Sequence, residues 1–317
     1  MKAAARAAVA AGLTGYILWR SHPRQVLAAM AGADWRPIAV AVALVLVDRA
    51  LMAYRWLQLL CIIDPADRPP LVEIMRIFFV STFVGTFLPA SIGADAVRAY
   101  SMTRLNVRGR DAVASVFMDR MLGVASILVM AALGLVLARD LAGNRTIVLA
   151  LIVAATVCVA TLLVVFSGAA AGMAGIAIRT LPARLHDVAG GLLASIRRYS
   201  AYHGQLVNVL LGSIAVQALR ITQAYFLGSG LGIAAPAATY FAFVPLILLV
   251  MLLPVTFNGI GTSQAAFVWF FGRAGIAAPA AFALSVLFVA LGVVGNLPGG
   301  VLYALGQRTR RPTERHG

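Results

Sequence analysis

This sequence has little charge, and acidic residues are the scarcest part of it. Asp, Glu, Lys and Arg together make up 12% of its 317 residues, and Asp plus Glu number only 11. A soluble domain averages about 25% charged residues and about 45–50% apolar ones. Here hydrophobic residues reach 62%, and the mean hydropathy is +0.92. The composition excludes an ordinary soluble domain and predicts a polytopic, all-α membrane protein.

Cysteine and histidine are too few, and too far apart, to suggest a reactive centre inside the membrane. The two cysteines, Cys61 and Cys158, lie in apolar runs, where we expect small buried side chains rather than a disulfide or a metal pair. The histidines all lie in polar connections or in the tail, at His22, His186, His203 and His316. The sequence also shows no nucleotide-binding loop. We therefore expect no metal, no cofactor, no catalytic residue and no enzymatic activity.

The basic residues outnumber the acidic ones, and their positions indicate topology. Lys plus Arg number 26, which gives a formal net charge of +15. In a soluble protein such an excess would suggest nucleic-acid binding, but here the arginines gather in short loops, as on the cytoplasmic side of membrane proteins. They cluster at 104–110, 179–198 and 306–317, whereas the connection 229–237 has no Lys or Arg. We expect that connection outside, the 179–198 connection and the tail in the cytoplasm, and contact with anionic lipid headgroups rather than nucleic acid.

The apolar runs predict about eight membrane segments in a single integral membrane domain over residues 1–317. In the first half, about 1–140, they cover about 3–19, 37–63, 71–90 and 112–138. In the second half, about 146–305, they cover about 146–168, 206–228, 237–257 and 276–305, with an interrupted segment at 258–273. The longest exceed the roughly 18 residues that mark a membrane span. We expect no separate soluble domain, and a basic cytoplasmic tail over 306–317.

The segment at 85–98 contains a helix breaker and two opposite charges. Pro89 and Gly93 interrupt the apolar run, and Asp95 and Arg98 follow directly. Proline removes a backbone donor and crowds the preceding turn, and glycine permits a reversal of the chain. Non-helical backbone at membrane depth survives only where protein or water satisfies it. The segment is therefore either a plain loop between two helices or a broken helix that lines a polar cavity.

A second interruption, at 253–273, follows the same plan in the other half of the chain. Pro254 ends an apolar run, Gly259 and Gly261 follow, and an apolar helix then resumes. Two such interruptions at corresponding places are a sequence sign of a transporter's binding site. We therefore expect two broken helices, re-entrant or crossing, that are related as internal repeats and share one cavity.

Several charged side chains lie inside the apolar runs, where each costs about 2.5–3.5 kcal/mol at the bilayer centre on insertion scales. They are Asp48, Arg49, Arg55, Asp119, Arg120 and Arg220. Adjacent residues on a helix point in different directions, so neither Asp48–Arg49 nor Asp119–Arg120 can easily satisfy itself, and each charge should need a partner on another helix. Two interpretations stay open for these residues, a structural ion-pair network and a wall of the substrate cavity.

Four stretches of the chain form a recognisable set. They are FLPASIGADAVRAY at 87–100, ASVFMDRMLG at 114–123, LPVTFNGIGTSQAA at 253–266, and the pair Arg55-Trp56. In this order and spacing they resemble the flippase-like integral membrane family named after the transmembrane region of lysylphosphatidylglycerol synthase, over nearly the whole chain. Two positions depart from the family's pattern, because Ala94 stands where a second glycine is common and Gln264 where members often carry Glu.

The resemblance implies which residues bind the substrate. The set comprises Gly93, Asp95, Arg98, Asp119, Arg120, Asn258, Gly259, Gly261 and Gln264, with Pro89 and Pro254 as the structural breaks. Arg98 and Arg120 would donate hydrogen bonds to a phosphate. Asp95 and Asp119 would orient these arginines or meet a cationic headgroup.

The same resemblance implies flippase-like lipid translocation, or handling of lipid headgroups, in the bacterial inner membrane. The expected partner is a membrane lipid, either an anionic phospholipid or a polyprenyl-type lipid. The alternatives are a membrane partner of a separate lipid-modifying synthase or glycosyltransferase, and a lipid-modifying transferase. Because the sequence has no aminoacyl-transfer domain, we do not expect this chain to synthesise a lysyl-lipid by itself.

Overall fold

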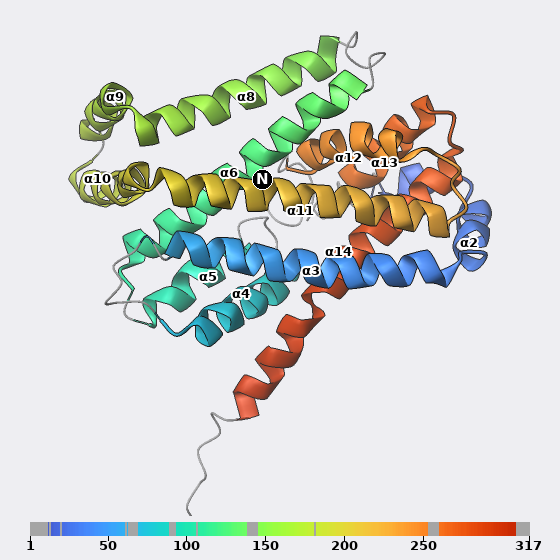
Figure 1. Ribbon diagram of the computed structural model, residues 1–317, viewed down its shortest axis with the longest axis horizontal. Helices are drawn as coiled ribbons and strands as arrows, with labels where there is room; N and C mark the ends of the chain where they lie inside the picture. The colour runs from blue at the N-terminus through green and yellow to red at the C-terminus, as the bar shows by residue number, and fades with distance from the viewer. Residues whose placement is uncertain are drawn as a thin grey trace, which may run out of the picture.

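The computed structural model is all-helical wherever it describes the chain. It describes residues 12, 14–19, 21–60, 62, 69–88, 93–105, 107–137, 145–180, 182–252 and 260–308. Figure 1 shows no strand among these residues, so the predicted all-α fold class is confirmed. Several predicted features lie outside the described residues: Pro89, Pro254, Asn258, Gly259, most of the run at 3–19, and the tail from 309 onward.

The described helices are spread over both halves of the chain. In the first half they are α2 (Pro23–Ala31), α3 (Trp35–Leu60), α4 (Leu71–Thr86), α5 (Gly93–Thr103) and α6 (Gly109–Leu137). In the second half they are α8 (Arg145–Phe166), α9 (Gly168–Arg179), α10 (Ala183–Arg197), the 3-10 turn η2 (Arg198–Ala201), α11 (His203–Gly230), α12 (Ala237–Met251), α13 (Thr262–Arg273) and α14 (Ala278–Arg308).

Five of the described helices, α3, α6, α8, α11 and α14, are long and apolar enough to cross a membrane. The chain is therefore a multi-pass membrane protein, while the predicted count of about eight segments and the internal repeats are not confirmed. A span needs about 20 residues at a rise of about 1.5 Å each. The helices α4, α12 and α13 have 16, 15 and 12 residues, too few to cross alone. The apolar runs at α4 and α12 continue into residues that the structure does not describe.

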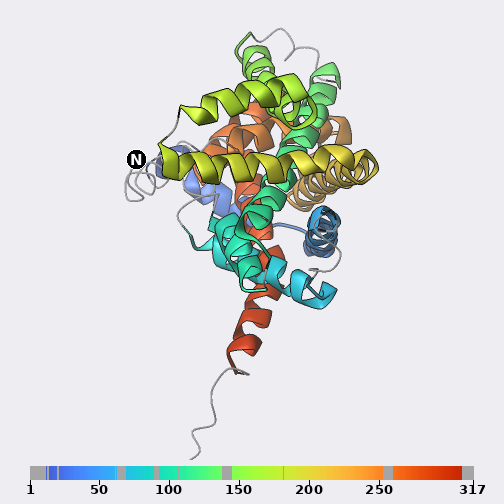
Figure 2. The ribbon, with the colours of Figure 1, turned by 90° about the vertical axis from the view of Figure 1, so that its left-hand side faces the viewer.

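Two antiparallel helices, α3 and α11, lie side by side along the face shown in Figure 1. The backbone N–H of Asp34 donates to the carbonyl oxygen of Gly230 at 2.8 Å, which ties the start of α3 to the end of α11. Helix α6 packs on α11 and α12, and α14 packs on α4 and α13. Figure 2 shows α9 and α10 lying across one end of this bundle.

Helix α8 is the least buried of the five spans. Only 6% of its apolar stretch is buried, and it packs mainly on α6, α9 and α10. Leu149, Val153 and Val157 are all exposed along it. A helix that is apolar on every side and packs on so few neighbours needs lipid around it.

The connection between α10 and α11 is held to the bundle by a buried carboxylate. Asp111, at the start of α6, accepts hydrogen bonds from Ser195 at 2.6 Å and from Arg198. The Tyr199 hydroxyl donates to the carbonyl oxygen of Leu59 at 3.3 Å. Burial raises the pKa of Tyr199, so the phenol stays protonated and remains a donor. These bonds fix the connection beside the ends of α3 and α6.

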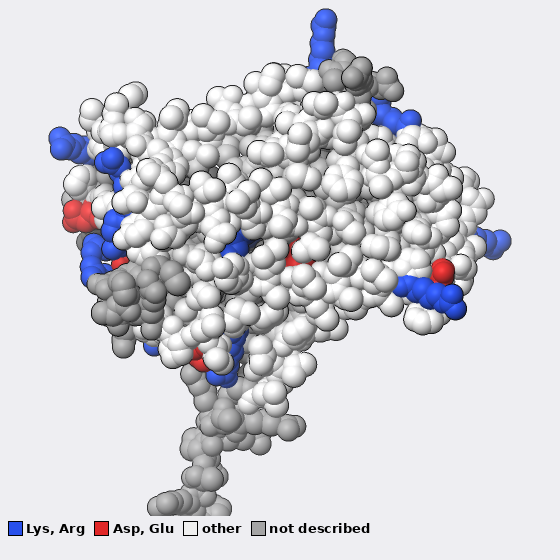
Figure 3. Space-filling model, in the orientation of Figure 1, with Lys and Arg blue, Asp and Glu red and all other residues white. Residues whose placement is uncertain are grey.

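The described basic clusters lie together at one end of the bundle. The α5–α6 connection, α9 and α10 lie at the left in Figure 1, and α2 and the α11–α12 connection lie at the opposite end. Figure 3 shows that the face between these ends carries almost no charge. The connections at 104–110 and 179–198 therefore lie at the opposite end of the bundle from 229–237, and the side of the membrane that each end faces stays a prediction.

Cysteine labelling tests this topology. In a background in which Cys61 and Cys158 are alanine, Ser229→Cys and Thr180→Cys should react with a membrane-impermeant maleimide from opposite sides. Both residues are exposed, and α11 and α9 end at opposite ends of the bundle. The measurement compares intact cells with inverted vesicles, and labelling of both positions from the same side would contradict the topology.

Candidate functional site

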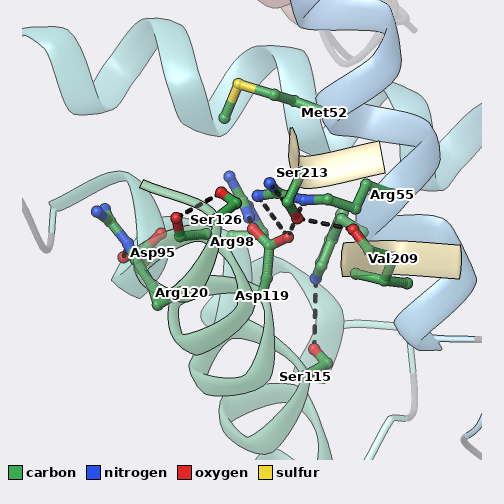
Figure 4. Close-up of polar contacts among 12 residues, drawn as sticks. Met52, Arg55, Asp95, Arg98, Ser115, Asp119, Arg120, Ser126, Val209 and Ser213 are labelled. Carbon is green, nitrogen blue, oxygen red and sulfur yellow. Dashed lines mark hydrogen bonds and ion pairs between the residues drawn. The ribbon is translucent and has the colours of Figure 1, made fainter. Parts of the chain in front are cut away.

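A buried carboxylate on α6 joins four helices. Asp119 accepts hydrogen bonds from Arg55 on α3, whose Nε and Nη2 both lie 2.8 Å from its Oδ1. Arg98 on α5 donates to Oδ2 through Nη1 at 3.3 Å. The Nη1 of Arg55 also donates to the hydroxyl of Ser213 on α11 at 2.9 Å. All four side chains are buried, so the group forms an ion-pair centre inside the bundle (Figure 4).

Arg98 is enclosed between two aromatic rings. Its guanidinium carbon lies 4.9 Å from the ring centre of Trp56 and 4.7 Å from that of Phe78, within the range of cation–π attraction. Its Nε is buried without a hydrogen-bond partner, and the residue is only 4% exposed. The packing of α3 and α4 against α5 covers Arg98, which is not among the residues that line the α5–α6 cleft, and its predicted role in substrate binding stays a prediction.

A second ion pair also links α5 and α6, but here the aspartate is on α5 and the arginine is on α6. Asp95 on α5 accepts a hydrogen bond from Nε of Arg120 on α6 at 2.6 Å. Asp119 and Arg120 therefore each meet a partner on a different helix, as predicted. Figure 4 shows these two adjacent side chains reaching different partners. Unlike Arg98, the side chain of Arg120 is 43% exposed.

The Arg120–Asp95 pair lies at an open cleft between α5 and α6. The cleft has a volume of about 430 Å³, and its other walls are apolar: Ala96, Ala99, Val113, Val116 and Phe117. A second cleft, of about 310 Å³, lies between α6, α8 and α10 and shares Phe117 with the first. The site thus combines an accessible ion pair with room for hydrocarbon in two clefts that meet at one aromatic side chain.

Another ion-pair group lies at the middle of α3. Asp48 accepts hydrogen bonds from Nη1 of Arg49 at 2.7 Å and from Nε of Arg220 on α11 at 3.3 Å. Arg49 also donates to Asn296 at 2.9 Å and to the carbonyl oxygen of Gly292 at 3.2 Å, both on α14. Asp48 and Arg49 therefore have the expected partners on other helices. The expectation that they do not satisfy each other is wrong, because the long arginine side chain bends back to its neighbour.

Sequence reasoning missed Asn296 and Thr86. The side-chain amide of Asn296 donates to the hydroxyl of Thr86 on α4 at 2.8 Å, so it joins α14 to α3 and α4. The sequence signal that could have revealed this contact is the single side-chain amide of Asn296 inside a long apolar run. Polar residues inside membrane segments commonly hydrogen-bond across helices.

The glycine at the start of α5 permits close helix packing. A Cβ on Gly93 would lie 2.5 Å from the Cβ of Leu88, and one on Gly85 would lie 2.4 Å from the Cβ of Ala94. Real side chains do not approach so closely, so α4 and α5 can reverse this tightly only with glycine at both positions. Gly93 is not among the residues that line the α5–α6 cleft, and the close approach it permits is one between protein segments.

Gln264 caps α13. Its Oε1 accepts hydrogen bonds from the backbone N–H of Gly261 at 2.5 Å and from the hydroxyl of Ser263 at 2.9 Å. Gly261 has a φ of +91°, a conformation that favours glycine. The structure therefore gives Gly261 and Gln264 a role in starting this helix. The predicted cavity shared by the two breaks stays a prediction, because Asn258 and Gly259 lie outside the described residues.

Removing the shared carboxylate of the buried group should destabilise the protein. Asp119→Ala leaves Arg55 and Arg98 buried without their counter-charge, and breaking a buried pair costs about 3–5 kcal/mol. We expect a clear fall in the thermal unfolding midpoint of the purified protein in detergent. The control is Glu73→Ala, which breaks a partly exposed pair with Arg76 worth about 0–1 kcal/mol. Equal midpoints for the two variants would show that Asp119 does not balance the buried arginines.

Comparison with known proteins agrees with the resemblance seen in the sequence. A family model described as the lysylphosphatidylglycerol synthase TM region matches residues 3–299, nearly the whole chain. A search of the curated proteins found no match. The matched range contains both helices of the cleft and the buried ion pairs of α3, α6 and α11. This chain therefore belongs to the family of the lysylphosphatidylglycerol synthase transmembrane region.

Proposed function

We propose that this protein binds an anionic membrane lipid at the α5–α6 cleft and moves its headgroup through the bundle, as a flippase-like translocase of the bacterial inner membrane. The observation that carries the proposal is the cleft itself. The half-exposed side chain of Arg120 stands at the edge of an apolar-walled volume of about 430 Å³. A lipid needs both features in one place, a polar contact for its headgroup and apolar walls for its chain.

Arg120 has the chemistry that a phosphate requires. Its guanidinium is a planar fork of N–H donors that matches the geometry of phosphate oxygens. Asp95 accepts from its Nε at 2.6 Å and so fixes the orientation of the fork. The pair therefore forms a pre-oriented contact for an anionic headgroup.

The balance of charge inside the bundle also supports an anionic ligand. The ion-pair groups contain five arginines and three aspartates, namely Arg49, Arg55, Arg98, Arg120, Arg220, Asp48, Asp95 and Asp119. They carry a formal excess of two positive charges, and unbalanced charge inside a membrane protein is costly. The phosphodiester of a lipid would offset one of these two charges, whereas a neutral headgroup would leave the whole excess in place.

Membership of the family supports lipid handling in general. Translocation is the more specific part of the proposal, and the arrangement of the arginines supports it. They extend from the cleft, through Arg55 and its contact with Ser213 on α11, to Arg220 beside the middle of α3. A membrane partner of a separate synthase would also bind a lipid, but it would have no use for a row of cations that leads away from the cleft.

A flip assay tests the proposal. Purified protein is placed in liposomes with fluorescent phosphatidylglycerol, and dithionite quenching measures the lipid that crosses. Arg120→Gln keeps most of the side chain's size but removes its charge. We expect a loss of rate of about tenfold or more, since a hydrogen bond to a charged group is worth about 1.5–3 kcal/mol. The control, Arg76→Gln, changes an arginine of α4 whose side chain is exposed to nearly the same extent as that of Arg120.

The assay separates the possible functions. Wild-type rates in Arg120→Gln would remove the cleft from the mechanism. Lipid binding by the wild-type protein without any movement would favour a membrane partner of a lipid-modifying enzyme.

Filling the cleft should also slow lipid translocation, although no charged residue is changed. Ala96 is an exposed residue of the cleft wall, so Ala96→Trp should place an indole in the lipid's space and leave the fold intact. We expect less co-purified lipid by mass spectrometry and a slower flip rate than for Ala96→Ser, the matched control. Equal lipid content in the two variants would count against the cleft as the binding site.

A further inference from the structure

We infer that Arg220 is the centre of a second anion site, beside the middle of α3, which receives the phosphate of the lipid after the α5–α6 cleft. This inference deepens the proposed function and rests on it for the source of the phosphate. The chemistry that the site recognises is a phosphate oxyanion, whether from a lipid headgroup or free in solution.

The first observation is that Asp48 holds one arginine closely and another loosely. Its carboxylate lies 2.7 Å from Arg49 and 3.3 Å from Arg220. The same arrangement occurs around Asp119, where the longer contact, also 3.3 Å, is to Arg98. One carboxylate cannot balance two guanidinium groups, so a formal charge of plus one remains at each aspartate.

Arg220 is the less satisfied arginine at Asp48. Arg49 donates to Asn296 and to a backbone carbonyl of α14 in addition to its aspartate. Arg220 donates through Nη2 to the sulfur of Met52 at 3.2 Å, and a thioether is a weak acceptor. The side chain of Arg220 is 23% exposed, so a ligand can reach it. Arg49 therefore anchors helices, and Arg220 is available to bind an anion.

Two glutamines on α11 flank Arg220 with unused hydrogen-bonding groups. Gln217 and Gln223 lie three residues before and after it and are 2% and 3% exposed. Among the described residues, Oε1 of Gln217 and Nε2 of Gln223 have no partner. Buried polar groups in proteins are nearly always paired. Gln217 donates through Nε2 to Ser126 on α6 at 3.2 Å, and its free Oε1 can accept from a headgroup hydroxyl. Gln223 can donate to a phosphate oxygen, so α11 offers both a donor and an acceptor near Arg220 in the sequence for a polyol phosphate.

A polar stripe on α11 joins this site to the buried group around Asp119. Ser213, Gln217 and Arg220 are spaced by four and three residues and so lie along one face of the helix. Ser213 accepts from Arg55 at 2.9 Å at one end of the stripe. The side chains of Arg120 and Arg220 are 43% and 23% exposed, whereas that of Arg55 between them is 5% exposed. The row of arginines is therefore accessible at both ends and closed in the middle, as a path with two binding sites requires.

Lipid counting tests the inference. Purified protein, delipidated in detergent, is titrated with dioctanoyl phosphatidylglycerol, and native mass spectrometry counts the molecules bound. The wild-type protein should bind two, Arg120→Gln and Arg220→Gln one each, and the double variant none. Inorganic phosphate is the second probe. Binding of phosphate at Arg220 with no lipid there would assign the site to a free anion and overturn the lipid path.

These outcomes keep the inference separate from the proposed function. Loss of one lipid in Arg220→Gln but none in Arg120→Gln would contradict the cleft and support the second site. If Arg220→Gln bound as many lipid molecules as the wild-type protein, the inference would be overturned, and the binding site at the α5–α6 cleft would be unaffected. In liposomes, Arg220→Gln should still capture lipid at the cleft but lose flip rate by about tenfold or more.

A second variant covers the case in which Arg220→Gln does not fold. Gln223→Leu replaces an unpaired buried amide with an apolar group, which the fold should tolerate. If the amide contacts phosphate, the second lipid should bind about tenfold more weakly. Unchanged affinity, equal to that of the control Gln205→Leu at an exposed position of α11, would contradict the site.

Discussion

The rest of the structure depends on the contact between Asp119 and Arg55. In a bilayer, no hydrophobic force drives one apolar helix against another, so packing and polar contacts set which helices meet and in what register. This ion pair joins α6 to α3, and the same two side chains hold Arg98 of α5 and Ser213 of α11. With these four helices fixed, the position of α5 against α6 follows, and so does the cleft between them.

The two arginines that pair α5 with α6, Arg98 and Arg120, differ in burial rather than in chemistry. Arg98 is enclosed by Trp56 and Phe78, whereas Arg120 opens into the cleft. Both pair with an aspartate of the facing helix. Because each helix supplies one arginine and one aspartate, buried Arg98 can hold the helices together while Arg120 stays accessible. Two arginines of different motifs can therefore serve structure and binding separately.

The sequence indicated the fold class and the residues that carry buried charge, because apolar run length and charge inside such runs are local features. It also required that Asp119 and Arg120 find partners on other helices, which they do. The enclosure of Arg98 was not predictable, since it depends on how α3 and α4 pack against α5. The cap formed by Gln264 was also missed, because a side-chain amide can bind a substrate or cap a helix, and the sequence does not show which backbone group lies beside it. The number of spans stays a prediction, because α4, α12 and α13 as described are each shorter than a membrane crossing and two of their apolar runs continue beyond the described residues.

The weak attachment of α8 has a consequence for the second cleft. Only 6% of the apolar stretch of this helix is buried, yet Ala160, Thr161 and Val164 of α8 form one wall of that cleft. Protein side chains thus cover little of the helix that forms this wall, and the acyl chains of the surrounding lipid must contact most of its surface. The second cleft is therefore bounded by a helix whose environment is chiefly hydrocarbon rather than protein.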